Sequence, residues 1–460
     1  MKDHMLILRK KFSALYTAPA RVIVFSFIFV ILIGGFLLSL PVSSKDGVTT
    51  GFFDSLFTAT SATCVTGFVL FDTYTKWTLF GQSVILLLVQ VGGIGIVTIS
   101  IFFYVVAGKK LGLRGMHLAK ESINIIDASN LAGLFKFIVI TTFSIEFIGA
   151  CILSLVFVSE YGVLKGVYIS FFLAISAFCN AGFDVLGFQA PYVSIMNYNN
   201  NPIVIYTIGV LIILGGLGFI VWYDLFNNGK QKWLLHTKVV LIMTFLLIVI
   251  GVLVFFILEY NNPLTLKNLT WPEKFNAAFF QSVTLRTAGF TSINFTNLKQ
   301  ITKMVALIIM LIGGAPGSTS GGIKITTLAI LVMTVISVIK NKPETIILKH
   351  KVPRSAVYKS VSMFILSIVV VILGSIVLYY SVNPDQDVSI ISSIFETISA
   401  FSTVGISTGV VGATGACGKI IVIFIMFIGR VGPISLLLSL AMRTNEDVHK
   451  IFPQAKIMVT

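Results

Sequence analysis

Four short stretches of this chain combine small or hydroxyl side chains with a terminal glycine, a pattern suited to binding a cation through backbone oxygens. These stretches, loops 1 to 4, are Ser61–Gly67, Ser176–Gly182, Val283–Gly289 and Ser399–Gly405. Glycine lacks a Cβ, so it reaches positive φ and lets backbone approach an ion closely. Rings of carbonyl oxygens from such loops can replace the hydration shell of a permeating cation. The candidate ligands are the backbone oxygens of Val65, Thr66, Gly67, Asn180, Ala181, Gly182, Thr287, Ala288, Gly289, Thr403, Val404 and Gly405.

A single stretch of this kind is typical of an ordinary turn after a helix, but four in equivalent positions indicate an internal repeat. Each follows a short apolar segment, at 53–63, 168–178, 274–284 or 391–401. A helix of that length is about 16 Å long, roughly half a bilayer core, so we expect these segments to enter the membrane and return. The negative end of each helix dipole then faces the loop and favours a cation.

Long hydrophobic segments flank each short helix. We expect the preceding helices at 21–40, 132–158, 236–260 and 356–381, and a second glycine cluster interrupts each following segment from Gly92, Gly215, Gly313 and Gly429. Irregular backbone is tolerated at membrane depth only where protein or a water-filled cavity surrounds it, so the four loops should face a common axis. We predict an all-α polytopic membrane protein of four repeats, with eight transmembrane helices and four re-entrant pore helices around one central pore. The repeats, units 1 to 4, occupy 1–130, 131–232, 233–350 and 351–460.

The composition excludes an ordinary soluble domain. The chain has 460 residues, of which 56% are hydrophobic and only 11% are charged, whereas soluble domains carry about 25% charged residues. The net charge of +15 comes from basic clusters at 2–21, 109–120, 230–238 and 340–359. Because these clusters alternate with hydrophobic blocks, they indicate cytoplasmic loops and cytoplasmic termini in a multi-pass protein of the cell membrane. The expected partner of this charge is anionic membrane lipid, not nucleic acid.

The sequence offers no arrangement typical of an enzyme. The cysteines Cys64, Cys151, Cys179 and Cys417 lack metal-ligand spacing, and beyond Glu146 the spans carry few groups that could be catalytic. We expect no covalently bound cofactor. A secondary transporter of a small solute would also have repeats and broken helices, but such folds typically relate two halves by inversion. Here the four units run in the same sense.

The residues also resemble a known family. Glycine at the end of all four loops, the run Thr-Ala-Gly-Phe at 287–290 and the run Phe-Ile-Gly-Arg-Val-Gly-Pro at 427–433 closely resemble the Trk/Ktr/HKT superfamily of potassium transporters, most of all the bacterial Ktr-type membrane subunit. The resemblance implies four repeats around one pore, potassium ions in the filter, uptake often promoted by sodium, and a homodimer. It also implies a separate cytosolic ring of nucleotide-binding (RCK-type) regulatory subunits, to which ATP or ADP would bind.

The resemblance bears on ion selectivity as well. In that family a glycine at all four filter positions goes with potassium selectivity, and a serine in the first repeat goes with sodium transport. Position 67 is glycine here. The alternative is a sodium-conducting protein of the same family. The glycine at position 67 argues against this alternative.

A glycine-rich loop at 313–322 interrupts the second hydrophobic segment of unit 3. Its glycine content and its proline exclude a regular helix, and a phosphate-binding loop would need a lysine directly after its last glycine, where Ile323 stands. A kinked helix packed on its neighbours and a flexible loop that obstructs the pore both stay open, and the resemblance favours the obstructing loop. The candidate gate residues are Gly313, Gly314, Ala315, Pro316, Gly317, Ser318, Thr319, Ser320, Gly321, Gly322, Lys324 and Arg430.

Ionisable residues inside the spans should have partners or a function. The resemblance suggests that Arg430 faces the pore and donates hydrogen bonds to carbonyls of the glycine-rich loop, and the alternative is an arginine that reaches the interface. We expect Lys324 to anchor the end of the same loop. We also expect Arg286, within loop 3, to form a salt bridge with Glu396 or Asp54. Glu146 is either a structural hydrogen-bond partner or part of a sodium-linked site.

Overall fold

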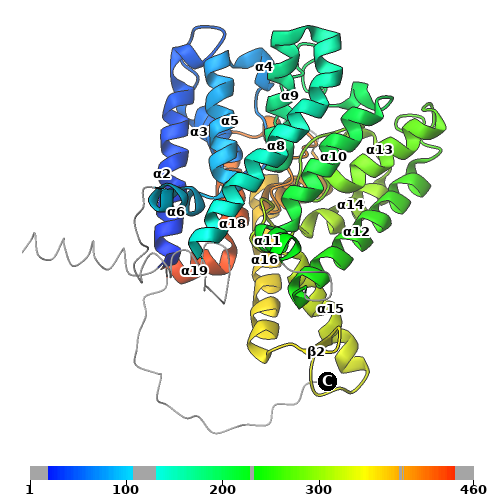
Figure 1. The fold of residues 1–460 in the computed structure, drawn as a ribbon. Coiled ribbons are helices and arrows are strands. Elements are labelled where there is room, and N and C mark those ends of the chain that lie inside the picture. The colour runs from blue at the N-terminus through cyan, green and yellow to red at the C-terminus, as the bar shows by residue number, and fades with distance from the viewer. Residues whose placement is uncertain (1–18, 107–130, 228–232, 383–385, 387, 441–460) are drawn as a thin grey trace, which may run out of the picture.

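The structure is a computed structural model that describes residues 19–106, 131–227, 233–382, 386 and 388–440. Figure 1 shows a bundle of long helices with shorter helices between them. Both termini and the basic segment 109–120 lie outside the described residues, so the expected orientation of the termini stays a prediction.

The first helix of each unit is long and unbroken. These helices are α2 (Pro19–Ser39), α8 (Leu131–Tyr161), α12 (Leu235–Glu259) and α16 (Arg354–Tyr380), within a few residues of the predicted bounds. Runs of leucine, isoleucine, valine and phenylalanine with no internal proline favour a helix, which pairs every backbone group internally, as a bilayer requires. By length and composition these four described helices can cross a membrane.

The short helix of each unit ends directly before its loop. These pore helices are α3 (Phe52–Thr63), α9 (Val163–Phe178), α13 (Trp271–Thr284) and α17 (Ile390–Phe401). Side-chain caps define two of their starts: Thr270 and Glu273 form a capping box on α13, and Ser389 accepts a hydrogen bond from Ser392 N on α17. Helix α9 begins five residues earlier than predicted, because a left-handed Gly162 separates it from α8 by a single residue.

The second helix of each unit is interrupted. The pairs α5 (Leu79–Ile94) and α6 (Ile96–Val106), and α10 (Pro202–Leu217) and α11 (Phe219–Asn227), bend by 85° and 91°. Unit 4 repeats the break between α18 (Ala416–Val431) and α19 (Pro433–Leu440), and unit 3 between α14 (Gln300–Leu311) and α15 (Ile325–Ile339). If each of the two bent pairs is one span, up to six described spans pass by length and composition. The predicted eight transmembrane helices therefore require every interrupted second helix to be counted as one crossing.

A glycine of the second cluster makes each sharp bend. Gly95, Gly218 and Gly432 cap α5, α10 and α18 with φ of +92°, +91° and +90°. Residues with a Cβ rarely adopt this conformation. The second glycine clusters of units 1 and 2 therefore contain the bend itself, and Gly432 breaks the second helix of unit 4 in the same backbone conformation.

Short elements complete the fold. They are α4 (Thr73–Lys76), the 3₁₀ turns η1 (Pro41–Ser43), η2 (Met196–Tyr198), η4 (Phe295–Asn297) and η5 (Val411–Ala413), and the hairpin of β1 (Ile346–Ile347) and β2 (His350–Lys351). The strands pair antiparallel, Ile346 with Lys351 and Ile347 with His350. The hairpin lies at the lower end of the molecule in Figure 1, where it joins α15 to α16.

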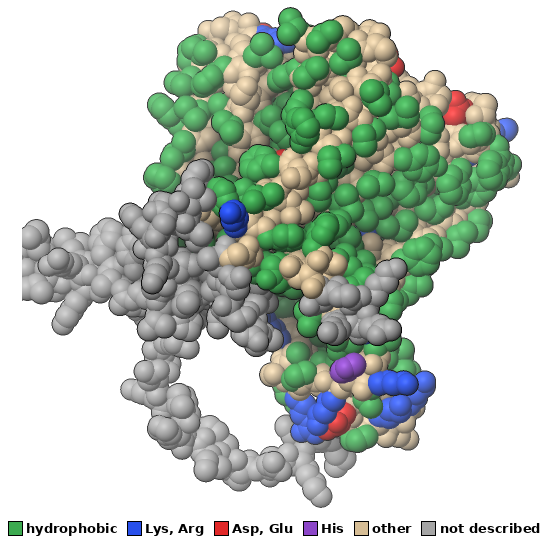
Figure 2. Space-filling view, in the orientation of Figure 1, with side chains coloured by type: hydrophobic (Ala, Val, Ile, Leu, Met, Phe, Trp, Pro, Cys, Tyr) green, Lys and Arg blue, Asp and Glu red, His purple; other side chains and the backbone are tan. Residues whose placement is uncertain are grey.

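The surface of the bundle is apolar where lipid would contact it. Figure 2 shows hydrophobic side chains over most of the visible face of the helices, while Lys and Arg gather at the lower end around the hairpin. Among the exposed apolar residues are Phe29, Leu155 and Phe245, each at least 65% accessible on a first helix. Exposed apolar surface of this extent is unstable in water and indicates a membrane environment.

Candidate functional site

The four loops share one unusual backbone conformation. Val65, Asn180, Thr287 and Thr403 hold equivalent positions two residues before the terminal glycine, and their φ angles are +56°, +58°, +70° and +53°. The terminal glycines also have positive φ, between +69° and +91°. A left-handed residue with a Cβ costs about 1–2 kcal/mol. Four such residues in register show that the surroundings impose one shape on all four loops.

Backbone hydrogen bonds hold each loop against the end of its pore helix. In units 1, 2 and 4 the residue before the glycine donates to the first residue of the stretch: Thr66 N to Ser61 O (2.8 Å), Ala181 N to Ser176 O (2.7 Å) and Val404 N to Ser399 O (2.8 Å). In unit 3 the donor Ala288 N reaches Thr284 O instead, at 3.0 Å. Loop 3, whose stretch begins with valine rather than serine, is thus the variant member.

The loops close into a ring in chain order. A Cβ added to Gly67 would lie 2.6 Å from Ala181 O, one on Gly182 2.7 Å from Ala288 O, and one on Gly289 2.8 Å from Val404 O. A Cβ on Gly405 would overlap Thr66 O, which closes the circle from unit 4 to unit 1. Each glycine therefore packs against the carbonyl of the next unit, with no room for a side chain. Four equivalent carbonyls around one axis can coordinate a desolvated monovalent cation.

The second glycine cluster presses against the same ring from behind. A Cβ on Gly92, Gly215 or Gly429 would overlap the last carbonyl of the pore helix in its own unit, Thr63 O, Phe178 O or Phe401 O. In unit 3 the equivalent Gly313 meets Gly321 O of the glycine-rich loop instead. These glycines let three second helices approach the pore helices closely enough to fix where the loops begin.

The glycine-rich loop is irregular and closed at its base. Ile312 and Ile323 form a parallel bridge, and Gly313 N donates to Ile323 O at 2.8 Å. Ile325 N donates to Gly314 O at 3.1 Å. The prediction that this segment is not a regular helix is confirmed.

The glycine-rich loop lies against the broken second helix of unit 2. Ala315 N donates to Gly216 O at 2.9 Å, and Phe219 N donates to Gly317 O at 2.9 Å. These bonds use the backbone groups that the bend at Gly218 releases from the helix. The two interruptions thus satisfy each other, as membrane-embedded backbone must.

The loop also contacts the ring itself. Gly321 N donates to Thr403 Oγ1 at 3.0 Å, and the Asn180 amide lies 3.0 Å from Ser320 Oγ. Thr319 and Ser320 are no more than 2% exposed. The loop is therefore packed directly against the residues of loops 2 and 4.

Two cationic side chains hold the glycine-rich loop. Arg430 on α18 donates to Thr319 O and to Gly92 O, and lies 3.4 Å from Gly93 O. The expected contact between Arg430 and a carbonyl of this loop is confirmed, and the same side chain also ties the loop to unit 1. Lys324 donates to Ser320 O, so it caps the loop from within.

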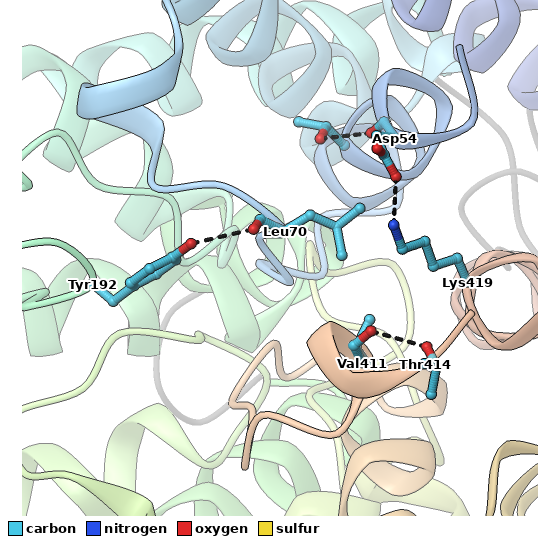
Figure 3. Close-up of polar contacts among 7 residues, drawn as sticks. Asp54, Leu70, Tyr192, Val411, Thr414 and Lys419 are labelled. Atoms are coloured by element: carbon cyan, nitrogen blue, oxygen red, sulfur yellow. Dashed lines mark hydrogen bonds and ion pairs between the residues drawn. The ribbon is translucent and has the colours of Figure 1, made fainter. Parts of the chain in front are cut away.

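The predicted salt bridge of Arg286 is wrong. Among the described residues Arg286 has no carboxylate in reach, and its Nη2 lies 3.4 Å from Thr244 Oγ1. Asp54 pairs instead with Lys419 on α18, at 2.7 Å (Figure 3). Arg286 follows the C-terminal end of α13, where the negative end of the helix dipole favours a cation.

Glu396 is engaged within its own unit. Its Oε1 accepts hydrogen bonds from Ser407 Oγ (2.6 Å), Thr408 N (2.9 Å) and Val410 N (3.1 Å). Its Oε2 has no hydrogen-bond partner among the described residues. Glu396 therefore holds the segment 407–410, which follows loop 4, and all of these hydrogen bonds are accepted by Oε1.

This asymmetry predicts a difference between two substitutions. We expect Glu396→Met to lower the free energy of unfolding by about 1–3 kcal/mol, because it leaves the buried Val410 N–H and two partly buried donors without their acceptor. Glu396→Gln keeps an acceptor at Oε1 and should retain most of the stability. Thermal unfolding of the purified proteins in detergent measures both. Equal stability of the two variants would contradict this role of Oε1.

Glu146 lies beside loop 2. Gln90 Nε2 donates to both of its carboxylate oxygens, at 3.1 and 3.0 Å, and the Cys179 thiol lies 3.7 Å from Oε1. These contacts join α5 and α8 to the end of pore helix α9. In these contacts Glu146 is a structural hydrogen-bond partner, which is one of the two alternatives that the sequence left open for this residue.

Several contacts of the site were not predicted from the sequence. The side-chain contacts of Asn180 and Thr403 with the glycine-rich loop link segments over 80 residues apart, and the partner of Asp54, Lys419, gave no local signal. The glycines at the helix breaks, Gly95, Gly218 and Gly432, did have a signal, since each falls three residues beyond the start of a second cluster.

The fold and the ring define a multi-pass, all-α membrane protein with four repeated re-entrant loops around one axis. Residues 15–450 match the TrkH family, described as cation transport protein. The chain therefore belongs to the TrkH family, in agreement with the resemblance that the loop glycines indicated.

Curated relatives and a solved structure agree with this assignment. The chain is 38% identical over 440 residues to the Ktr system potassium uptake protein B of Bacillus subtilis, covering 95% of this chain and 96% of the relative. It is 37% identical over 444 residues to the potassium/sodium uptake protein NtpJ of Enterococcus hirae, covering 96% and 97%. The crystal structure of the potassium transporter TrkH from Vibrio parahaemolyticus is similar in fold, with a TM-score of 0.68 at 19% identity, over 90% of this chain and 84% of that one.

Proposed function

We propose that this chain is the ion-translocating subunit of a Ktr-type potassium uptake system in the cell membrane. The observation that carries the proposal is the ring in which each loop glycine packs against a carbonyl of the next unit. Such a ring presents oxygen ligands and no side chains to an ion, and the ends of four pore helices add negative potential. The names of the two relatives, a potassium uptake protein and a potassium/sodium uptake protein, support potassium as the ion.

We propose potassium as the transported ion and sodium as an ion that promotes its uptake. Glycine at all four ring positions, Gly67 included, supports potassium selectivity. The relative from Enterococcus hirae is named for both potassium and sodium. We therefore include sodium-promoted uptake in the proposal and keep a sodium-conducting protein as the second candidate.

The glycine-rich loop is the proposed gate. Arg430 and Lys324 bring two cationic groups to the loop, which packs against the ring residues Asn180 and Thr403. A positive charge near the ion path raises the barrier for a cation, since Coulomb repulsion is strong away from water. Conduction then requires the loop and its arginine to move aside.

The proposed assembly has more than one kind of subunit. The name "Ktr system" of the Bacillus subtilis relative supports a multi-component uptake system. We propose a homodimer of this chain, with cytoplasmic termini, on a cytosolic ring of RCK-type subunits that bind ATP or ADP. The units would be 1–130, 131–232, 233–350 and 351–460, and the one proposed metal site would be a potassium site at the ring.

Rubidium uptake tests the proposal. In a bacterium that lacks its own potassium uptake systems, we expect this chain to restore growth at low potassium and to accumulate rubidium, if necessary with a cytosolic partner supplied. Gly289→Asp should abolish uptake, because the Cβ alone would lie 2.8 Å from Val404 O and the carboxylate would need still more space. Uptake that survives Gly289→Asp at equal expression would refute the ring as the ion path. Excess sodium over rubidium uptake would favour the second candidate.

A further inference from the structure

Two residues of the ring hold the glycine-rich loop through their side chains. Thr403 Oγ1 accepts a hydrogen bond from Gly321 N at 3.0 Å. The Asn180 amide lies 3.0 Å from the hydroxyl of the neighbouring loop residue, Ser320. Because the units follow one another around the ring in chain order, loops 2 and 4 lie across the axis from each other. The glycine-rich loop is thus held from two opposite sides.

These contacts are buried and tightly packed. Asn180, Thr403 and Ser320 are each at most 2% exposed, so water does not compete for their hydrogen bonds. A Cβ on Gly321 would overlap the Thr403 side chain. Turned so that its oxygen accepts from Ser320, the Asn180 amide also donates to Ala177 O and Ile212 O, at 3.1 Å each. Displacement of the glycine-rich loop therefore leaves buried polar groups unpaired on both sides.

The same two residues orient the carbonyls of the ring. Asn180 and Thr403 are left-handed, with φ of +58° and +53°. The residue after each one carries the oxygen that packs against another unit's glycine, Ala181 O near Gly67 and Val404 O near Gly289. The backbone angles of Asn180 and Thr403 thus set both the direction of a ring oxygen and the place where a side chain meets the loop.

Units 1 and 3 have no such connection. The equivalent residue in loop 1 is Val65, whose side chain forms no hydrogen bonds. In loop 3 it is Thr287, whose hydroxyl has no partner among the described residues. Within these four equivalent positions the connection is therefore confined to units 2 and 4.

We infer that Asn180 and Thr403 are positioning residues that couple cation occupancy of the ring to the position of the glycine-rich loop, an inference that rests on the proposed function. A cation on the ring oxygens stabilises the left-handed conformation of both residues. That conformation presents their side chains to Ser320 and Gly321, so a bound cation stabilises the loop across the pore. By linkage, displacement of the loop weakens cation binding by the same factor.

Thiol labelling of the loop tests this coupling. Ser318 is half-buried, and its hydroxyl accepts a hydrogen bond from Ser320 N at 3.3 Å but forms none with Asn180 or Thr403 among the described residues, so Ser318→Cys reports loop position. The exposed Cys151 and Cys417 are replaced by serine, and the chain without Ser318→Cys gives the background of the buried Cys64 and Cys179. The purified full-length protein is labelled with a charged methanethiosulfonate in potassium chloride or in choline chloride of equal ionic strength. We expect potassium to slow labelling about fivefold, as the gain of one or two buried hydrogen bonds allows.

Matched substitutions assign the effect to the two contacts. Thr403→Val removes the acceptor and places there the residue that loop 1 already has, and Ser320→Ala removes the partner of Asn180. Each should reduce the potassium effect to less than about twofold. Thr287→Val makes the same change at the equivalent position of loop 3, without a contact to the loop, and should retain the effect. A potassium effect that Thr403→Val changes no more than Thr287→Val does would overturn the inference.

Rubidium flux into proteoliposomes separates this inference from the proposed function. A parent protein that carries rubidium but labels equally in potassium and choline overturns the coupling alone. A parent that carries no rubidium, yet labels more slowly in potassium in a way that Thr403→Val removes, overturns the proposed transport and retains the coupling. Absence of both effects overturns both.

Discussion

Replacing Gly405 by alanine should reduce rubidium uptake at least tenfold without preventing folding. The new Cβ would overlap Thr66 O, and φ at this position is +82°. The left-handed conformation alone costs about 1–2 kcal/mol with a Cβ, and the overlap forces Thr66 O out of the ring. About 1.4 kcal/mol corresponds to a factor of ten. The cost of the left-handed alanine and the cost of the displaced Thr66 O together exceed this energy, so we expect uptake to fall by more than tenfold. Uptake in potassium-deficient cells at matched expression is the measurement.

Gly412→Ala is the matched control for this substitution. Gly412 belongs to the same unit, seven residues further along, and a Cβ there meets nothing within 4 Å. We expect its uptake to equal that of the parent. If Gly405→Ala and Gly412→Ala had the same uptake, the packing of the ring would not matter for conduction. Size-exclusion profiles of both proteins check that they are folded.

Replacing Arg430 by glutamine should increase the maximal rate of rubidium uptake about tenfold or more. Arg430 donates to Thr319 O on the glycine-rich loop and to Gly92 O on α5. A hydrogen bond from a charged group contributes about 1.5–3 kcal/mol, so its loss releases the loop, and the barrier from the positive charge disappears as well. Initial uptake rates at saturating rubidium measure the change.

Arg354→Gln is the control for charge alone. Arg354 is exposed at the start of α16, away from the glycine-rich loop, and its replacement should leave the maximal rate unchanged. A rate that falls in Arg430→Gln while the protein stays folded would contradict a gating role and indicate that Arg430 supports the ring. Cell-surface protein levels of both variants normalise the rates.

The helices of this protein were largely predictable because a bilayer imposes strong rules on sequence. A span needs about 20 apolar residues with every backbone group paired internally, and the predicted bounds of the first helices differ from the structure by a few residues at most. The pore helices ended where predicted in all four units, at Thr63, Phe178, Thr284 and Phe401. Repetition supplied the rest of the signal, since four weak motifs in register exclude chance.

The partners of the buried charges were not predictable. Arg286 was expected to form a salt bridge with Glu396 or Asp54, because a positive charge within loop 3 would otherwise repel a cation. In the structure Glu396 turns to backbone N–H groups of its own unit, and Asp54 turns to Lys419. Pairing of side chains depends on which helix faces cross at one depth, and the composition of a single helix does not determine this.

By itself, the sequence determined the membrane fold, the four repeats, the glycines of the ring and the irregular loop at 313–322, because each of these depends on local chemistry: apolar length, missing Cβ atoms, or residues that cannot continue a helix. The tertiary structure alone decided that the loops close into a ring in chain order, that the second helices bend at Gly95, Gly218 and Gly432, and that Asn180 and Thr403 reach the glycine-rich loop. These are contacts between units that are far apart in the chain. They form only when all four units pack around one axis. This packing brings together polar backbone groups that have no water to bind at membrane depth, so they must form hydrogen bonds with one another.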